Sequence, residues 1–341
     1  MPQSPSISLF TVVMNRLHHL RITLPENLRN NNLSNTEFVV LDYGSCDGVG
    51  DYILQNFVAE LQSGKLRYFR EQATYFDRCK SRNMAASLCS GDVICNVDAD
   101  NFTGVNFDRY LQNQFLGLSN VFVSALGSST CSTDSLGRIA MRKRHFIRCG
   151  GYDESFRGYG YEDYDLNARL QRMGLTKVVI EHDHYLQAIS HGRAERISNE
   201  WHYNNLQTLY TQQINDVNRV LLFLFRDGTC EYGLVVENEK GFKFSLAGGA
   251  WQKGSWSDSG DHIALEFGQL KSSLRKSGDL LVGGMHFLRA EQDTRVMEES
   301  ILFNTEIANR YRYHSSEKPI NLKNTENGIT KHYVVSARQE A

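Results

Sequence analysis

The sequence is poor in the features that mark several classes of protein. It has no long block of lysine and arginine and a formal net charge of −2, so we expect neither a nucleic-acid surface nor a polybasic membrane patch. It contains no run of about 18 apolar residues, the length that a membrane-spanning helix requires. Residues 1–5 lack the basic segment and the apolar run of a signal peptide. We therefore expect no signal peptide and no transmembrane anchor, while peripheral contact with a membrane stays open.

The cysteines also lack the pattern of a disulfide framework. There are seven, an odd number, and none is part of a CxxC pair. Several lie in apolar segments, where a reduced thiol behaves as a small hydrophobic side chain. We therefore expect reduced thiols in the core and a cytoplasmic location.

What the chain does contain is the composition of a globular protein with room for two domains: 341 residues, 41% hydrophobic and 22% charged. In its first half, short apolar segments alternate with helical patterns. Strands are predicted at 7–13, 38–41, 66–69 and 93–97, and helices at 17–28, 52–61 and 77–90. This alternation predicts an α/β fold, in which a mostly parallel sheet has helices on both faces and ligands bind beyond the carboxyl ends of the strands.

Acidic residues follow two of these predicted strands. Asp42 ends the second strand, and Asp98 and Asp100 come directly after the fourth. Because the carboxyl ends of parallel strands meet at one edge of a sheet, we expect these acids to share a crevice. Two carboxylates at i and i+2 can hold one Mg²⁺ or Mn²⁺, which in turn can hold a diphosphate. An Asp-x-Asp pair is also common in turns, so the metal prediction depends on this context.

A loop rich in glycine and tyrosine, 150–161, leads into the acids Glu162, Asp163 and Asp165. The apolar spacing that follows predicts a helix that ends at Gly174. Acids at a helix start complement the helix dipole, so one or two of them need no functional explanation. The loop before them favours a site in which a sugar ring is held beside a catalytic carboxylate. We expect the helix N-terminus to lower the pKa of that carboxylate.

Several motifs together resemble the nucleotide-sugar glycosyltransferases of the GT-A fold. The segments 39–48, 82–85 and 96–100 are similar to glycosyltransferase family 2. The segments 137–146 and 150–165 are similar to the beta-1,4-galactosyltransferases and the polypeptide N-acetylgalactosaminyltransferases, including their Gly-aromatic-Gly-x-Glu-Asp core. The resemblance covers a little over half of the chain, and it implies a GT-A (Rossmann-like) fold.

The resemblance also implies roles by position, for an inverting transfer from a UDP-sugar. Asp42 would contact the uracil ring, Asp98 the ribose or the metal, and Asp100 the metal. Asp163 would be the catalytic base, with Glu162 orienting donor or acceptor. We also expect Thr11, Asn15, Arg16, Arg82 and Gly160 among the residues that bind the nucleotide sugar.

The third metal ligand is expected to be a histidine. His182, His184 and His191 lie within one short segment downstream of the acids. An isolated histidine is more often structural, but three near an acidic site favour a metal ligand. We choose His191, which lies at nearly the family's distance from the base; the other two stay open as ligands or as acceptor-binding groups.

The acceptor-side motif favours UDP-galactose or UDP-N-acetylgalactosamine as donor and a glycan or glycolipid as acceptor, as in surface polysaccharide synthesis. Tyr164 stands where the galactosyltransferases carry a further aspartate, which alters the acceptor side. A nucleotidyltransferase acting on sugar phosphates is an alternative, but segment 14–17 lacks its glycine-rich phosphate loop. The second alternative is a carbohydrate-binding protein without enzymatic activity. In that case UDP with Mn²⁺ would leave the melting temperature of the protein unchanged.

The second half has a different pattern. Short strands are predicted at 220–225, 232–236, 242–246, 263–267 and 280–288. They predict a small sandwich or partial barrel, in which Trp251 and Trp256 are more often core residues than sugar-stacking ones. We therefore divide the chain into a GT-A domain (1–215), a β-rich domain (216–304) that supports acceptor binding or homo-oligomer formation, and a polar tail or helix (305–341).

Overall fold

The computed structural model describes residues 4–130, 133–154, 156, 158–215, 218–236, 252–288 and 333–334. The chain forms two compact units. The first combines Met1–Glu154, Glu162–His191 and Ile320–Ala341, and the second combines Ser155–Tyr161 with Gly192–Pro319.

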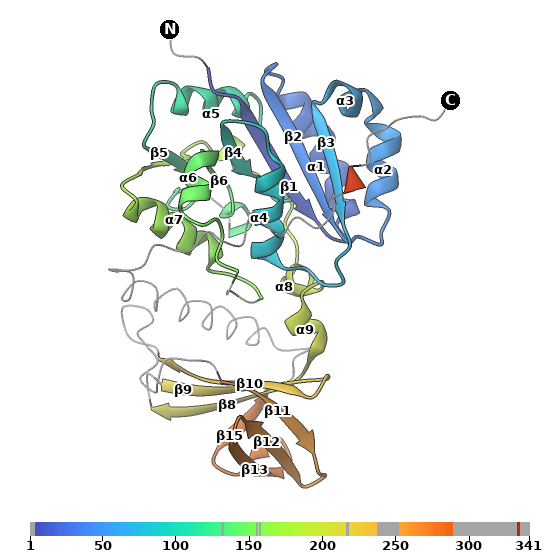
Figure 1. Cartoon of the computed structure of the whole chain (residues 1–341), viewed down its shortest axis with the longest axis vertical. Coiled ribbons are helices and arrows are strands. Elements are labelled where there is room, and N and C mark those ends of the chain that lie inside the picture. The colour runs from blue at the N-terminus through green and yellow to red at the C-terminus, as the bar shows by residue number, and fades with distance from the viewer. Residues whose placement is uncertain are drawn as a thin grey trace. The chain divides into compact units, whose positions relative to one another are not determined.

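An eight-stranded sheet is the centre of the first unit, with the strand order β16-β3-β2-β1-β4-β6-β5-β7 (Figure 1). Neighbouring strands run parallel except at β6, which is antiparallel to β4 and β5, and at β16, which is antiparallel to β3. The strands are β1 (Ile7–Val13), β2 (Thr36–Tyr43), β3 (Leu66–Glu71), β4 (Val93–Asn96), β5 (Val121–Ser124), β6 (Ile139–Arg142), β7 (Thr176–Val179) and β16 (Tyr333–Val334).

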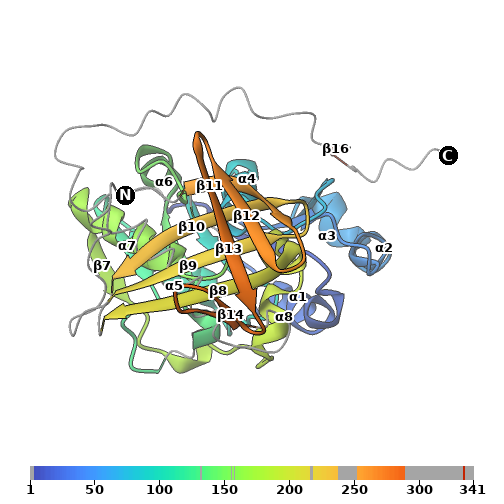
Figure 2. The ribbon, with the colours of Figure 1, turned by 90° about the horizontal axis from the view of Figure 1, so that it is seen from below.

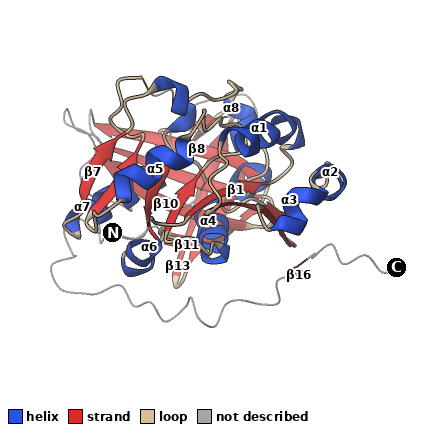
Figure 3. Ribbon diagram, turned by 90° about the horizontal axis from the view of Figure 1, so that it is seen from above, coloured by secondary structure: helices blue, strands red, loops and turns tan. Residues whose placement is uncertain are grey.

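Helices cover both faces of this sheet, with α1 and α5 on one face and α4 and α6 on the other (Figure 3). The α-helices of this unit are α1 (Leu17–Asn30), α2 (Val49–Asn56), α3 (Val58–Ser63), α4 (Arg78–Leu88), α5 (Phe107–Phe115), α6 (Lys143–Arg148) and α7 (Glu162–Arg172), and its 3-10 turns are η1 (Thr133–Ser135) and η2 (Asp183–Tyr185).

The apolar runs of the strands follow from this two-sided cover. Ile7 and Leu9 of β1 pack in one core with Leu20 and Leu24 of α1, while Phe10, the next residue along the strand, is buried on the other face. A strand that is covered on both faces is apolar at successive positions instead of alternating. Helix α4 begins where the Asp77 side chain accepts a hydrogen bond from the Lys80 amide at 2.9 Å, an N-cap that fixes the start of the helix.

The second unit is a closed antiparallel barrel, and Figure 2 looks onto its strands. Trp256 is partly buried and packs against its core, and its indole N–H donates to the Phe225 carbonyl at 2.8 Å. The helices and strands are α8 (Arg193–Ile197), α9 (Trp201–Asn205), β8 (Leu206–Asn215), β9 (Asn218–Phe225), β10 (Thr229–Val236), β11 (Gln252–Asp258), β12 (His262–Phe267), β13 (Leu270–Ser277), β14 (Leu280–Leu281) and β15 (Met285–Leu288).

The predicted fold class is confirmed: a mostly parallel sheet with helices on both faces, followed by a smaller β domain. The units divide at Gly192, ahead of the boundary at residue 216 expected from the sequence, because β8 pairs with β9 and β15 of the barrel. The expected strand at 242–246, Trp251 and most of the segment 305–341 lie outside the described residues.

Two further observations concern the described part of the chain. Its helices include none long and apolar enough to cross a membrane. Five of its cysteines are buried as free thiols, as expected for core residues, and Cys46 is an exposed free thiol.

Candidate active site

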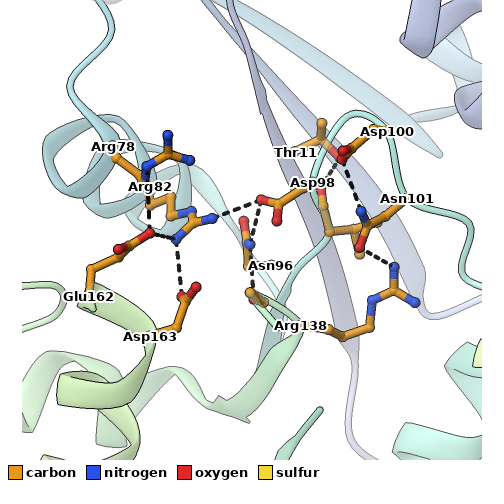
Figure 4. Close-up of polar contacts among 12 residues, drawn as sticks. Thr11, Arg78, Arg82, Asn96, Asp98, Asp100, Asn101, Arg138, Glu162 and Asp163 are labelled. Carbon is orange, nitrogen blue, oxygen red and sulfur yellow. Dashed lines mark hydrogen bonds and ion pairs between the residues drawn. The ribbon is translucent and has the colours of Figure 1, made fainter. Parts of the chain in front are cut away.

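The predicted Asp-x-Asp pair follows the carboxyl end of β4. A hydrogen bond from the neighbouring strand β1 fixes the backbone at this point. The Thr11 hydroxyl on β1 donates to the Val97 carbonyl at 2.8 Å, directly before Asp98 (Figure 4). Asn96 donates from Nδ2 to Asp98 Oδ1 at 3.0 Å and to the Gly137 carbonyl at 3.0 Å. Thr11 therefore acts on the backbone that positions the acids, and Asn96 fixes the side chain of Asp98.

Arg82 on α4 joins Asp98 to the acids at the start of α7 (Figure 4). Its Nη2 lies 2.9 Å from Asp98 Oδ1. Its Nη1 lies 3.0 Å from Glu162 Oε1 and 3.1 Å from Asp163 Oδ1. The guanidinium, only 4% exposed, thus unites three predicted site residues from two distant segments. Because its donors are committed to carboxylates, Arg82 organises the site, and its predicted contact with the nucleotide sugar remains a prediction.

One tyrosine and one glycine of the motifs lie beside Arg82 and Asp98. The guanidinium lies over the ring of Tyr152, 5.4 Å from its centroid, where the negative ring face attracts a cation. A Cβ at Gly137 would lie 2.7 Å from Asp98 Oδ2, so a side chain there would displace the carboxylate. Asn83 holds the loop, since its Oδ1 accepts from the Tyr152 amide at 2.7 Å and its Nδ2 donates to the Tyr152 carbonyl at 2.9 Å.

Charge within this cluster is unbalanced. Arg82, together with Arg78 at 3.5 Å from Glu162, faces three carboxylates. Burial raises the pKa of Asp163 to about 7; the Arg82 charge opposes this, while Glu162 and Asp98 reinforce it. Burial acts on Asp98 in the same direction, but Arg82 and the hydrogen bond from Asn96 hold the pKa of Asp98 below its ordinary value.

The pKa expected for Asp163 was therefore wrong in direction. The helix dipole alone would lower it, but removing a carboxylate from water beside other carboxylates has the larger effect. A carboxyl group that titrates near neutral pH can accept a proton more readily than an ordinary aspartate.

The predicted metal ligands Asp100 and His191 lie together. His191 Nε2 is 2.7 Å from Asp100 Oδ2, with the two side chains 10% and 12% exposed. The Ile189 amide donates to the Asp100 carbonyl at 2.8 Å, which ties the histidine segment to the acid. The rings of His182 and His184 pack with Tyr185 instead. Of the three candidate histidines, His191 is the one whose contacts match the expected site.

These residues fit a divalent cation. Carboxylate oxygens with one imidazole nitrogen are donors that Mn²⁺ accepts. Neighbouring ligand atoms of an octahedral ion lie about 3 Å apart, given bonds of about 2.1 Å. The measured 2.7 Å between His191 and Asp100 needs only a small opening to reach that distance.

Asp42, Asn15 and Arg16 lie at the ends of β1 and β2. Asp42 is fully buried and accepts from the Ser45 amide and the Tyr68 hydroxyl, each at 2.8 Å. Asn15 Oδ1 accepts from the Cys46 amide at 2.7 Å, which links the two loops, and the backbone carbonyl of Arg16 accepts from the Leu20 amide at 3.0 Å at the start of α1. These contacts stabilise the loops; the predicted contacts with the nucleotide remain predictions. Gly160, with φ of +97°, belongs to the second unit, and its predicted contact with the nucleotide sugar remains a prediction.

Sequence reasoning did not assign roles to Arg78, Asn96, Asn101 and Arg138, which support the acids. Asn101 Nδ2 donates to Asp100 Oδ1 at 2.9 Å, and Arg138 Nη2 donates to Asn101 Oδ1 at 3.0 Å. Their places in the sequence could have pointed to them. Asn96 and Asn101 flank the Asp-x-Asp segment, and Arg138 precedes the apolar run of β6.

Residues 108–183 match a family model described as glycosyltransferase like family 2. The matched segment includes Glu162, Asp163 and Arg138. No curated protein matches the sequence.

Solved structures similar to this chain include a mannosyltransferase from Pyrobaculum calidifontis in complex with GDP-Man and Mn²⁺, at 16% identity and a TM-score of 0.44, covering 54% of this chain and 57% of that one. Another is S. aureus TarS 1-349 in complex with UDP, at 15% identity and a TM-score of 0.40, covering 48% and 54%. The chain thus spans little more than half the length of either structure.

Proposed function

We propose that the chain is a glycosyltransferase that moves a sugar from a UDP-sugar to a hydroxyl group of an acceptor, with Mn²⁺ or Mg²⁺ and with inversion. The observation that carries this proposal is the Arg82 cluster. There Asp98, at the end of β4, and Asp163, at the start of α7, bind the same guanidinium, so a donor-side acid is adjacent to a candidate base. The family match over residues 108–183 supports the same class of reaction.

In the proposed reaction Asp163 accepts the proton of the acceptor hydroxyl. The freed oxygen attacks the anomeric carbon from the face opposite the diphosphate, the bond from that carbon to the phosphate oxygen breaks, and UDP leaves. No covalent intermediate with the chain is required. The raised pKa of Asp163, which has burial as its main cause, suits a base that works near neutral pH.

The other acids have supporting tasks. Glu162 binds Arg82 at 3.0 Å and so keeps the guanidinium between base and donor side. Asp98, Asp100 and His191 would hold the divalent cation, which when bound offsets the charge that develops on the leaving diphosphate. Asp42 and Asn15 would contribute to the nucleotide end through the loops that they stabilise.

The finer assignments rest on the sequence motifs. The Gly-Tyr-Gly-Tyr-Glu-Asp segment at 158–163 favours galactose or N-acetylgalactosamine as the transferred sugar. A glycan or glycolipid acceptor, as in surface polysaccharide synthesis in the cytoplasm, is consistent with this motif. We propose that the barrel unit supports acceptor binding or self-association.

A donor screen tests the proposal. UDP-, GDP- and CMP-sugars are incubated with the protein and Mn²⁺, and release of the nucleotide is measured. We expect the fastest release from UDP-galactose or UDP-N-acetylgalactosamine. A preference for GDP- or CMP-sugars would contradict the donor assignment. If no donor turns over and UDP with Mn²⁺ leaves the melting temperature unchanged, a binding protein without activity is favoured. Synthesis of a nucleotide sugar from a sugar phosphate and UTP would indicate the nucleotidyltransferase instead.

A further inference from the structure

Arg138 is one of the largest fully buried side chains of the chain, at 1% exposed. Burying a guanidinium costs free energy that its hydrogen bonds have to offset. Arg138 donates to the Phe102 carbonyl at 2.8 Å, to the Tyr185 carbonyl and to the Asn101 side-chain oxygen at 3.0 Å. It also lies over the Phe107 ring, 5.4 Å from the centroid. These contacts therefore hold the Arg138 side chain in one conformation.

The guanidinium fixes which way the Asn101 amide points. A guanidinium has donors and no acceptor, so the amide oxygen of Asn101 must face Arg138 and the amide nitrogen must face the other way. That nitrogen donates to Asp100 Oδ1 at 2.9 Å and to the Asp134 carbonyl at 3.0 Å. With Oδ1 held in this way, Asp100 turns its other oxygen, Oδ2, to His191. Figure 4 shows Arg138, Asn101 and Asp100 in this sequence.

Arg138 also joins the two segments that carry the candidate ligands. The Phe102 carbonyl belongs to the loop that follows Asp100, and the Tyr185 carbonyl to the segment that leads to His191. The Phe102 amide donates to the Gln187 carbonyl at 2.9 Å between the same segments. One buried side chain thus sets both the rotation of a carboxylate and the distance between two chain segments.

We propose that Arg138 and Asn101 are positioning residues that preorganise Asp100 and His191 for the divalent cation. This inference rests on the proposed function, because it concerns the same metal site. If Arg138 is altered, the Asn101 amide oxygen loses the donor that holds it, so the amide and the Asp100 carboxylate bound to its nitrogen can rotate away from their present positions. Loss of an outer partner of a metal ligand typically lowers metal affinity by about 10- to 100-fold.

The test measures Mn²⁺ affinity directly, from the electron paramagnetic resonance signal of free Mn²⁺, with and without UDP. The variants are Asn101→Ala and Arg138→Lys, which keeps the charge but not the planar fork of donors. The matched control is Asn31→Ala. Asn31 is equally buried, and its side-chain nitrogen donates to the Asn27 carbonyl and the Thr103 hydroxyl instead of to a candidate metal ligand. Thermal unfolding in EDTA measures how much each substitution lowers the stability of the metal-free protein.

We expect Asn101→Ala and Arg138→Lys to weaken Mn²⁺ binding by about 10- to 100-fold, while Asn31→Ala loses stability but keeps the affinity of the unaltered protein. Equal affinities in all four proteins would overturn the positioning role and leave the proposed function standing. If one variant does not fold, the other decides the question, as does Asn101→Ser, which is smaller but polar. Absence of Mn²⁺ binding by the unaltered protein, with UDP present, would overturn this inference and the metal dependence of the proposed function together.

Discussion

The two compact units differ in how they arrange their charged side chains. In the sheet unit, Arg82 and Glu162 are buried against each other at the carboxyl ends of the strands, together with Asp163. In the barrel, Glu266 and Lys271 pair across β12 and β13 at 2.9 Å while both remain largely exposed. Buried charges cost free energy unless partners offset it, whereas exposed pairs cost and contribute little. Glu231 of β10 is also buried, at 7% exposed, so the distinction of the sheet unit is that several buried charges gather at the carboxyl ends of its strands.

Metal removal should show the largest difference between the two units, because it should affect turnover and leave the barrel unchanged. We expect EDTA to reduce turnover to background and added Mn²⁺ or Mg²⁺ to restore it, because Asp100 and His191 supply oxygen and nitrogen ligands for such an ion. Nucleotide release is measured in each condition, and barrel unfolding in EDTA serves as the control that should not change. Full turnover in EDTA would show that Asp100 and His191 are not metal ligands.

The pH dependence of turnover should follow Asp163. Burial, the main cause, raises its pKa to about 7, so below that pH the base is protonated and turnover should fall about tenfold per pH unit, with a plateau above. The matching effect on stability has the opposite sign: the protonated form is favoured in the folded state, so this contribution is complete at acid pH and is lost as the pH rises through about 7. A turnover profile that is flat between pH 5.5 and 8 would rule out this titration.

Asp165 should matter for stability more than for turnover. Its carboxylate lies 2.7 Å from Arg169, which also donates to the Cys149 carbonyl at 2.8 Å and to the Gly151 carbonyl. Breaking such a buried pair costs about 3 kcal/mol. We expect Asp165→Asn to lower the free energy of unfolding by that order in a denaturant titration, while the folded variant keeps most of its turnover. A variant that is stable but inactive would assign Asp165 to the chemistry.

The smallest effect is expected in the barrel. Lys271→Ala removes the exposed pair with Glu266 and should change the free energy of unfolding by less than about 1 kcal/mol. Turnover should be unaltered, since the proposed base and metal ligands all belong to the sheet unit. Loss of turnover in this variant would mean that the barrel takes part in the reaction, and the contrast between the units would fail.

Much of the sheet unit could be predicted from the sequence, because strand and helix periods are local signals. The expectation that Asp42, Asp98 and Asp100 share one crevice came from parallel topology, and the choice of His191 from the family resemblance. The first barrel strand, 206–215, was not predicted, since Gln212 and Gln213 interrupt its apolar alternation.

The supporting groups could not be derived in the same way. A single arginine on α4 gives no sign in the sequence that it will meet three carboxylates, because two of them lie about 80 residues away. The orientation of Asn101 depends on Arg138, which approaches only in the folded sheet. The pKa of Asp163 was misjudged because burial is a property of tertiary packing, whereas the helix start is visible locally.

The most direct test compares Asp163→Asn with Glu162→Gln in turnover and in UDP-sugar affinity. Asp163→Asn keeps size and hydrogen bonding but cannot accept the proton, so turnover should fall by about 10²- to 10⁴-fold with donor affinity nearly unchanged. Glu162→Gln, which weakens the hold on Arg82, should slow turnover and also raise the Michaelis constant of a substrate. Near-normal turnover in Asp163→Asn together with an inactive Glu162→Gln would contradict the assignment of the base.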